Sequence, residues 1–249
     1  MVVIHLEEMD SIKLMNRVDS KFVTTDGMLE RILEMAENLY RVLEVDGSTV
    51  AEYDSLYYDT AELKMYVAHQ NGKLTRQKVR TRTYVSSGDT FLEIKRKNNH
   101  GRTKKKRMQI PLECFRDFSR AEGAADYLAA KSWFTAEELA PKLRTRFERI
   151  TLVNKGKTER LTIDRKLRFE NCVSGKEASL DGAVIIELKQ DGLCWSPMKE
   201  ILSQLRVKPL RVSKYCIGTV LTDPGIRKSR FIEKIRKIEK LTDKKYLER

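Results

Sequence analysis

The chain has 249 residues, which is room for one large domain or two small ones at roughly 100–200 residues per domain. Hydrophobic residues make up 41% and charged residues 34%, a globular composition that excludes a disordered or fibrous chain. Lys and Arg number 49 against 36 Asp and Glu, so the formal net charge is +13. The expected partners are therefore anionic: nucleic acid, anionic lipid, or phosphorylated small molecules and polymers.

The sequence also limits the cellular location and the kinds of catalytic or metal site that we expect. Its longest apolar runs, such as 183–186, fall far short of the ~20 residues needed to span a bilayer. No charged leader precedes the short apolar run at the start, so we expect a cytoplasmic protein. The four cysteines form no CxxC pair and the chain has three histidines, which disfavours structural zinc and His-based catalysis. Phosphate chemistry carried by Lys, Arg and carboxylates stays open.

The first predicted element is an amphipathic helix over 28–43, where apolar residues recur at three- and four-residue spacing behind Asp26 as a cap. From about 53 to 110 the period changes to two, which predicts antiparallel strands joined by hairpins. A helical insertion follows near 114–143, with Pro141 breaking it. The turn signals between the strands lie at 71–72, 86–89 and 98–101.

Period two resumes after the insertion, and the chain then becomes helical again. We predict strands at 146–153, 160–169 and 183–189, and helices at 198–205 and from Ser213 onward. The segment 226–249 predicts a basic amphipathic helix that either packs on the protein, pairs with a partner or lies on an anionic membrane surface. We therefore expect one domain over 1–225, with the helical insertion near 114–143, followed by this C-terminal helix.

Six of the predicted strands have one charged and one apolar face, because side chains two residues apart share a face. An ordinary half-buried strand with a solvated polar face is one reading of each. The repetition of Lys and Arg in one phase favours another, in which the sheet curls into an antiparallel barrel with a cationic lumen and helices outside. The charged faces hold Lys78, Arg80 and Arg82; Glu93, Lys95 and Lys97; Lys105 and Arg107; Arg149; Arg160 and Asp164; and Glu187 and Lys189.

A set of short segments follows in order along most of the chain: 17–22 (RVDSKF), 57–60 (YYDT), 79–84 (VRTRTY), 91–97 (FLEIKRK), 185–189 (IIELK) and 213–215 (SKY). Taken together, they resemble the VTC domain. This is the polyphosphate polymerase domain of the vacuolar transporter chaperone complex, also found in bacteria, and a member of the triphosphate tunnel metalloenzyme (CYTH-like) superfamily. The resemblance implies an α+β fold with an antiparallel tunnel of about eight strands.

The resemblance implies an ATP-dependent polyphosphate polymerase, which transfers the terminal phosphate of ATP to polyphosphate with Mn²⁺ or Mg²⁺. Glu187 would be the metal ligand and Glu93 a second candidate, although cross-strand ion pairing is the alternative for Glu93. Lys214, beside a helix start, is singled out by the resemblance alone. The implied catalytic residues are Lys21, Arg80, Arg82, Lys95 and Lys214, and the implied substrate-binding residues are Lys97, Lys105, Arg107, Arg149, Arg160 and Lys189.

The chain also departs from the family pattern. Its first strand has Arg17-x-Asp19-x-Lys21 in place of the Glu-x-Glu-x-Lys of hydrolytic relatives, which favours transfer over hydrolysis because hard oxygen ligands are fewer. Phe22 and Phe147 stand where the family often has Tyr. The alternatives are a tripolyphosphate or nucleoside triphosphate hydrolase and a non-catalytic polyphosphate-binding protein. A nucleic-acid-binding module is disfavoured because the cations follow one strand phase and lack interleaved aromatics.

Overall fold

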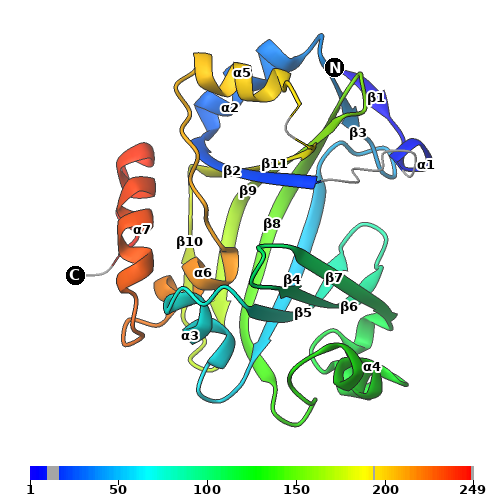
Figure 1. Cartoon of the computed structure of the whole chain (residues 1–249), viewed down its shortest axis with the longest axis vertical. Coiled ribbons are helices and arrows are strands. Elements are labelled where there is room, and N and C mark those ends of the chain that lie inside the picture. Colours follow the sequence, from blue (N-terminus) through cyan, green and yellow to red (C-terminus); the bar gives the residue numbers. More distant parts are fainter. Residues whose placement is uncertain (10–16, 193, 248–249) are drawn as a thin grey trace.

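The computed structural model describes residues 1–9, 17–192 and 194–247. Its centre is an antiparallel path of eight strands that curls around a concave face (Figure 1). Alternating apolar residues build the convex face of these strands, as the period of two predicted. The order along the path is β2 (Arg17–Thr25), β11 (Ala183–Asp191), β9 (Glu159–Asn171), β8 (Ala140–Asn154), β4 (Ala51–Asp59), β5 (Arg76–Tyr84), β6 (Thr90–Lys97) and β7 (Thr103–Ile110).

The predicted barrel is not closed by strand pairing. Within the described residues the path ends at β2 and β7, which do not pair with each other. The segment 209–213 follows the free edge of β2 instead: the Leu210 amide donates to the Lys21 carbonyl at 2.8 Å, and Phe22 and Pro209 form an isolated bridge. At its other end the Lys78 ammonium of β5 donates to Ser213 Oγ at 2.7 Å. A connecting segment therefore crosses the gap beside β2.

The predicted helix at 28–43 is shorter than expected. Helix α2 (Asp26–Ala36) begins after Thr25, whose hydroxyl accepts from the Met28 amide at 3.3 Å. Residues 40–43 instead form β3 (Tyr40–Leu43), which pairs with β8 and with β1 (Val2–Ile4). The wholly buried ring of Tyr40 packs with the strands there. Sheet pairing thus outweighed the helical spacing of this segment.

The predicted helical insertion is likewise shorter. It contains 3₁₀ turns at Leu112–Cys114 and Phe118–Arg120 and one helix, α4 (Ala124–Lys131). Pro141 does not break a helix but lies in β8, where the pairing register with β4 shifts between Tyr57 and Tyr58. Such a bulge tolerates the missing amide hydrogen of proline.

Helix α3 and the short strands were missed by the sequence analysis. The α3 segment (Lys64–Gln70) falls in the region predicted to be strands. The buried Asp59 carboxylate lies at the end of β4. Its two oxygens accept hydrogen bonds from the backbone amides of Met65 and Tyr66, in the first turn of α3, at 2.9 Å each. The remaining short elements are α1 (Leu6–Met9) and β10 (Glu177–Ser179), the latter paired with β9. Local hydrogen bonding by Asp59 therefore decides where α3 begins.

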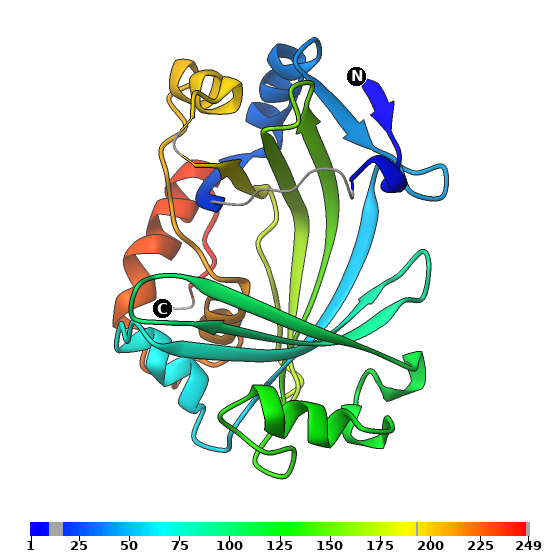
Figure 2. The same ribbon diagram turned by 45° about the vertical axis from the view of Figure 1, so that its right-hand side comes forward.

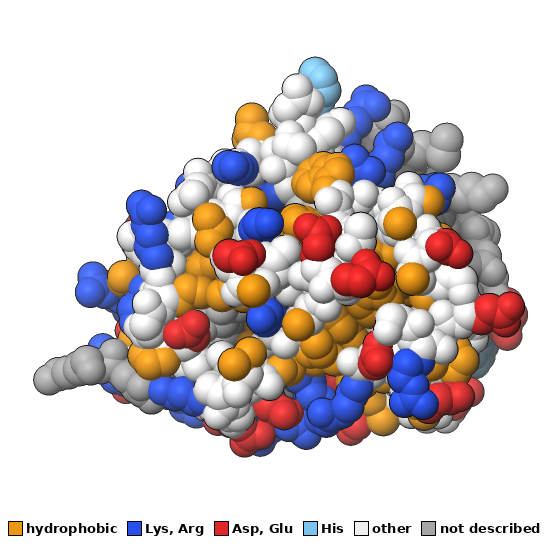
Figure 3. Space-filling view, turned by 90° about the horizontal axis from the view of Figure 1, so that it is seen from below, with side chains coloured by type: hydrophobic (Ala, Val, Ile, Leu, Met, Phe, Trp, Pro, Cys, Tyr) orange, Lys and Arg blue, Asp and Glu red, His pale blue; other side chains and the backbone are white. Residues whose placement is uncertain are grey.

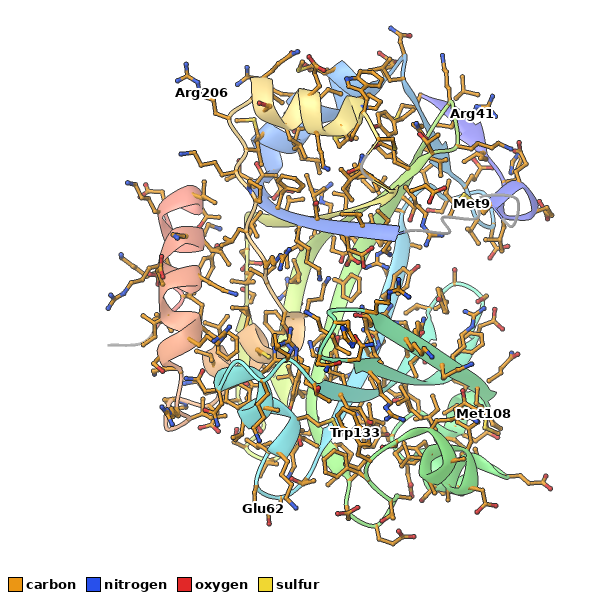
Figure 4. All side chains as sticks on the ribbon, in the orientation of Figure 1. Met9, Arg41, Glu62, Met108, Trp133 and Arg206 are labelled. Atoms are coloured by element: carbon orange, nitrogen blue, oxygen red, sulfur yellow. The ribbon has the colours of Figure 1, made fainter. Side chains whose placement is uncertain are left out.

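Helices cover the convex face of the sheet (Figure 2). Helices α2 and α5 (Pro197–Gln204) pack over β11 and β9, and α4 packs over β5 to β7. Met108, labelled in Figure 4, lies on that apolar side between β7 and α4. None of the described helices is both long and apolar enough to span a bilayer.

Helix α6 (Lys214–Thr222) lies against one end of the concave face and α7 (Ser229–Thr242) packs beside it. A Cβ at Gly218 would lie 2.4 Å from the Phe169 ring and 2.7 Å from Leu143, so only glycine allows α6 to lie this close to the strands. Apolar side chains therefore fill this end of the concave face, and the N-terminus of α6 points toward the other, charged end.

Candidate functional site

The register of the ladders brings the predicted cations together. Every predicted strand residue of the site falls on one face of the sheet, in rows of directly paired positions. With Lys214 from α6, these residues line the charged end of the concave face, which we call the lumen; Figure 4 shows the side chains between the two halves of the sheet. The rows are Asp19–Lys189–Arg160, Lys21–Glu187–Thr162, Arg149–Asp164, Ser55–Arg82, Arg80–Glu93–Arg107, Lys78–Lys95–Lys105 and Arg76–Lys97.

Glu93 is a buried carboxylate, 2% exposed, held between two cations. Arg80 donates to one of its oxygens from Nε at 2.8 Å and from Nη2 at 2.5 Å, and the Lys105 ammonium contacts the other. Burial acts to raise the pKa of Glu93, but the charges of Arg80, Arg82 and Lys105 outweigh it and hold the pKa well below its usual range. Glu93 is thus ionised and fixes the Arg80 guanidinium.

Asp164 repeats this arrangement on the other half of the sheet. It is 2% exposed and accepts two hydrogen bonds from Arg149, at 2.6 and 2.8 Å, while Lys214 contacts one of its oxygens. Its pKa is also depressed, because the charges of Arg149 and Lys214 outweigh the opposing effect of burial. The sequence analysis placed Asp164 on the charged face but gave it no role. Its signal was a lone carboxylate between cations on one strand face.

Glu187 is held more loosely. Its carboxylate lies 3.3 Å from the Lys21 ammonium and 3.6 Å from that of Lys189, both longer than the contacts of Glu93 and Asp164. Burial acts to raise its pKa, and the charges of Lys21, Lys189 and Lys95 overcome this, so Glu187 is ionised. Within the described residues no group of three His, Cys, Asp or Glu side chains could hold a metal ion by itself. A cation at Glu187 would therefore need further oxygen ligands, such as water or a phosphate.

Aromatic rings support the arginines of the lumen. Tyr53 and Phe147 stack at 5.3 Å, and the guanidinium carbons of Arg82 and Arg149 lie 5.1 and 4.8 Å from the Tyr53 ring centre. The Lys214 ammonium lies 4.4 Å from that of Phe147. Cations over ring faces gain electrostatic stabilisation. The sequence analysis missed Tyr53 in this role, and Phe147 does face the lumen.

Phe22 does not face the lumen. It packs in the apolar core beneath α2 and α5, opposite Ile186 on the convex side of the sheet. The hydroxyl that relatives often carry at this position would therefore point away from a lumen substrate in this chain. The comparison drawn for Phe22 from the sequence does not apply to the site.

Several lysines of the lumen have lowered pKa values. Burial is the largest cause, and neighbouring cations add to it, so that the pKa of each of Lys105, Lys189 and Lys214 falls to about 8. The hydroxyl of Tyr57 accepts from Arg80 at 2.9 Å, and its ring stacks on Tyr215. Burial alone would raise the pKa of Tyr57, but nearby cations lower it to about 7. An anion entering the lumen would relieve this repulsion.

The face of the molecule seen from below carries charges of both signs. Figure 3, a view from below, shows acidic side chains beside basic ones around exposed apolar groups. This surface is not a uniform basic patch of the kind that nucleic-acid binders present. Among the described residues on this face, therefore, the chain offers no extended basic surface.

The fold is found among solved structures. A protein from Bacillus halodurans, named as a candidate adenylate cyclase, matches over 80% of this chain and 96% of its own, with a TM-score of 0.52 and 12% identity. A candidate adenylyl cyclase from Hippeastrum, described as having a dominant triphosphatase activity, matches over 82% and 95%, with a TM-score of 0.51 and 10% identity. The expected triphosphate tunnel-like fold, mostly antiparallel with flanking helices, is therefore confirmed.

The model of the VTC domain family matches residues 16–222. The chain belongs to this family, as the ordered segments indicated. A search of curated proteins finds no match to the sequence. A VTC domain on a tunnel fold supports an activity on polyphosphate or triphosphates.

Proposed function

We propose that this protein is a polyphosphate polymerase that transfers the terminal phosphate of ATP to a growing polyphosphate chain in the lumen. One observation carries the proposal: Glu93, Asp164 and Glu187 each lie between two cations, and Lys and Arg far outnumber the carboxylates along the described rows of the lumen. A row of phosphates supplies the missing negative charge along the whole face. Arg and Lys match phosphate oxygens as hydrogen-bond donors.

The arginines would do most of the binding work. Glu93 holds Arg80 and Asp164 holds Arg149, so their forks are oriented before substrate arrives, and Ser55 accepts from Arg82 at 2.9 Å. Phosphoryl transfer needs alignment and charge neutralisation more than covalent work from the protein. No general base is needed, because a terminal phosphate is already largely ionised near pH 7. We place Lys21, Arg80, Arg82, Lys95 and Lys214 around the reacting phosphates.

The remaining predicted cations would hold the polymer. In this proposal the oxygens of successive phosphates bind the following side chains of the lumen: Lys97, Lys105, Arg107, Arg149, Arg160 and Lys189.

Glu187 fits a divalent ion better than Glu93 does. Mg²⁺ is usually held by one or two carboxylates plus substrate phosphates. Glu187, with its longer ion-pair contacts, would serve as that carboxylate, and the contacts of Glu93 support the ion-pairing alternative for it. The ion, Mn²⁺ or Mg²⁺, would neutralise charge on the transferring phosphoryl group when bound.

The test is to incubate the purified protein with ATP and Mn²⁺, resolve polyphosphate on a stained gel, and measure ADP and free phosphate in parallel. A polymer ladder with matching ADP supports the polymerase. Free phosphate without polymer would instead support the second candidate, a triphosphate hydrolase, which the same cationic lumen could serve. If neither product forms, both enzyme candidates are overturned and a polyphosphate-binding protein remains.

A further inference from the structure

Five basic side chains gather at the outer end of the lumen, where β5 begins and β6 ends, beside α7. We call Arg76, Lys97, Arg211, Arg230 and Lys234 the basic rim. The function proposed above does not use four of them. Figure 2 shows the start of β5 and the turn after β6 on the same side of the molecule as α3 and α7.

The rim continues the lumen without a break. Arg76 pairs directly with Lys97, and the next pair on the same face is Lys78 with Lys95, in the lumen. Successive pairs on one face lie roughly 7 Å apart, twice the rise of about 3.3 Å per residue. Arg211 lies two residues before Ser213, whose hydroxyl accepts from Lys78 at 2.7 Å. A linear anion leaving the lumen past Lys78 therefore meets rim cations next.

Helix α7 adds the outer part of the rim. The Lys234 ammonium donates to the Arg211 carbonyl at 2.7 Å, which fixes the helix against the 209–213 segment. The Arg230 guanidinium lies over Gly72, where a Cβ would be 2.4 Å from its Nη1. Gly72 has a φ of +71°, so glycine is suited to this position on both grounds. Two helical residues are thus held at the mouth of the lumen.

The rim cations repel one another. Burial lowers the pKa of Lys97, and Arg76 and Arg211 lower it further. Burial also lowers the pKa of Lys234, followed by the charge of Arg230, with Arg211 and Arg76 contributing as well. Cations gathered in this way attract anions, and a polyanion can meet several of them at once.

From this placement we propose that the basic rim is a binding surface for the part of a linear polyphosphate chain that extends beyond the lumen. The inference rests on the proposed function, because it takes the same polymer as that function. A membrane is disfavoured as the partner, because the apolar face of α7, with Phe231, Ile235 and Ile238, is buried in the protein and unavailable for insertion.

The rim predicts a dependence on chain length. Tripolyphosphate is short enough to be held in the lumen alone, whereas a linear polyphosphate of several tens of phosphates reaches the rim as well. We would measure binding of both ligands over a series of salt concentrations, using the wild-type chain and the variant Arg211→Gln, Arg230→Gln, Lys234→Gln. The double variant Arg211→Gln, Arg230→Gln, which changes exposed side chains only, covers the case in which loss of the Lys234 hydrogen bond perturbs folding.

The triple variant should bind long polyphosphate about tenfold or more weakly than the wild type. The slope of its log affinity against log salt concentration should be smaller by about two, because each lost phosphate contact of a single-stranded polyanion contributes roughly 0.7. Its affinity for tripolyphosphate should be unchanged. The matched control Arg116→Gln, Arg120→Gln, Lys131→Gln removes the same charge from exposed positions near α4 and should retain the wild-type slope.

The outcomes separate the two proposals. Polymer synthesis by the wild type, with both slopes unchanged in the rim variant, overturns the rim and keeps the polymerase. Tight, rim-dependent binding of long polyphosphate without any synthesis overturns the polymerase and keeps the rim. Equal losses in the rim and control variants, or a rim variant that loses only co-sedimentation with phosphatidylserine vesicles, overturn the rim as a polyphosphate site.

Discussion

Replacing Asp164 by Asn should destabilise the protein while leaving its shape intact. The side chain is 2% exposed and is contacted by Arg149 and Lys214, each 14% exposed. Removing one partner of a buried ion pair costs about 3–5 kcal/mol, because an uncompensated charge stays behind. Asn keeps one acceptor for Arg149, so we expect the lower end, about 3 kcal/mol. For a chain of this size that corresponds to a fall in Tm of roughly 6–12 °C.

The measurement is chemical and thermal denaturation of the Asp164→Asn variant beside Glu177→Gln as a control. Glu177 is 70% exposed and lies 3.7 Å from Arg146, an exposed pair worth less than about 1 kcal/mol. Tripolyphosphate should stabilise the Asp164→Asn variant more than the wild type, because two lumen cations have lost their partner. A loss of stability no greater than that of the control would refute the reasoning that Asp164 neutralises the lumen.

Further predictions concern the metal, pH, Tyr57 and α6. Glu187→Gln should lower turnover by about two decades at saturating Mn²⁺, and near wild-type turnover would exclude Glu187 as the ligand. Because the pKa of each of Lys105, Lys189 and Lys214 is about 8 in the folded protein and 10.5 in a free lysine, tripolyphosphate affinity should fall as pH rises through 8. The stability of the ligand-free protein should rise over the same window, since the unfolded chain then binds more protons; parallel changes would contradict this. The phenolate absorbance should titrate near pH 7 and lose that transition in Tyr57→Phe. Gly218→Ala should cost about 1–3 kcal/mol in urea denaturation through the clash with Phe169, and a more stable variant would show that the strands yield.

Strand periodicity predicted most of the lumen because side-chain direction in a strand follows from sequence alone. Arg80, Glu93, Arg149 and Glu187 were all placed on one face, and the ladders bring these faces together. Period two carries no information about which strands face each other. Only the structure shows that Glu93 of β6 and Asp164 of β9 lie in opposite halves of the sheet, each beside its own arginine.

What strand phase could not predict has local causes. Lys214 lies on a helix, so strand phase could not place it beside Asp164, and the resemblance alone singled it out. Phe22 and Lys21 were both assigned by comparison with relatives. Lys21 faces the lumen, so alternation along β2 puts its neighbour Phe22 on the other face. The prediction of a helix over 28–43 overran its end at 36 because residues 40–42 pair with β8 instead. Helix α4 ends at Lys131, where the Gln77 side chain of β5 donates to the Ser132 hydroxyl and accepts from the Trp133 amide.

The segment 209–213 has a mechanical consequence. A strand ladder resists opening through many regularly spaced hydrogen bonds. The segment 209–213 instead meets β2 through the hydrogen bond of the Leu210 amide, and it meets β5 through the hydrogen bond from Lys78 to Ser213. Regions with few hydrogen bonds open at a lower free energy than a ladder does. The lumen is thus held least firmly along the segment 209–213. Its width can change there while the arginines on the paired strands keep their spacing.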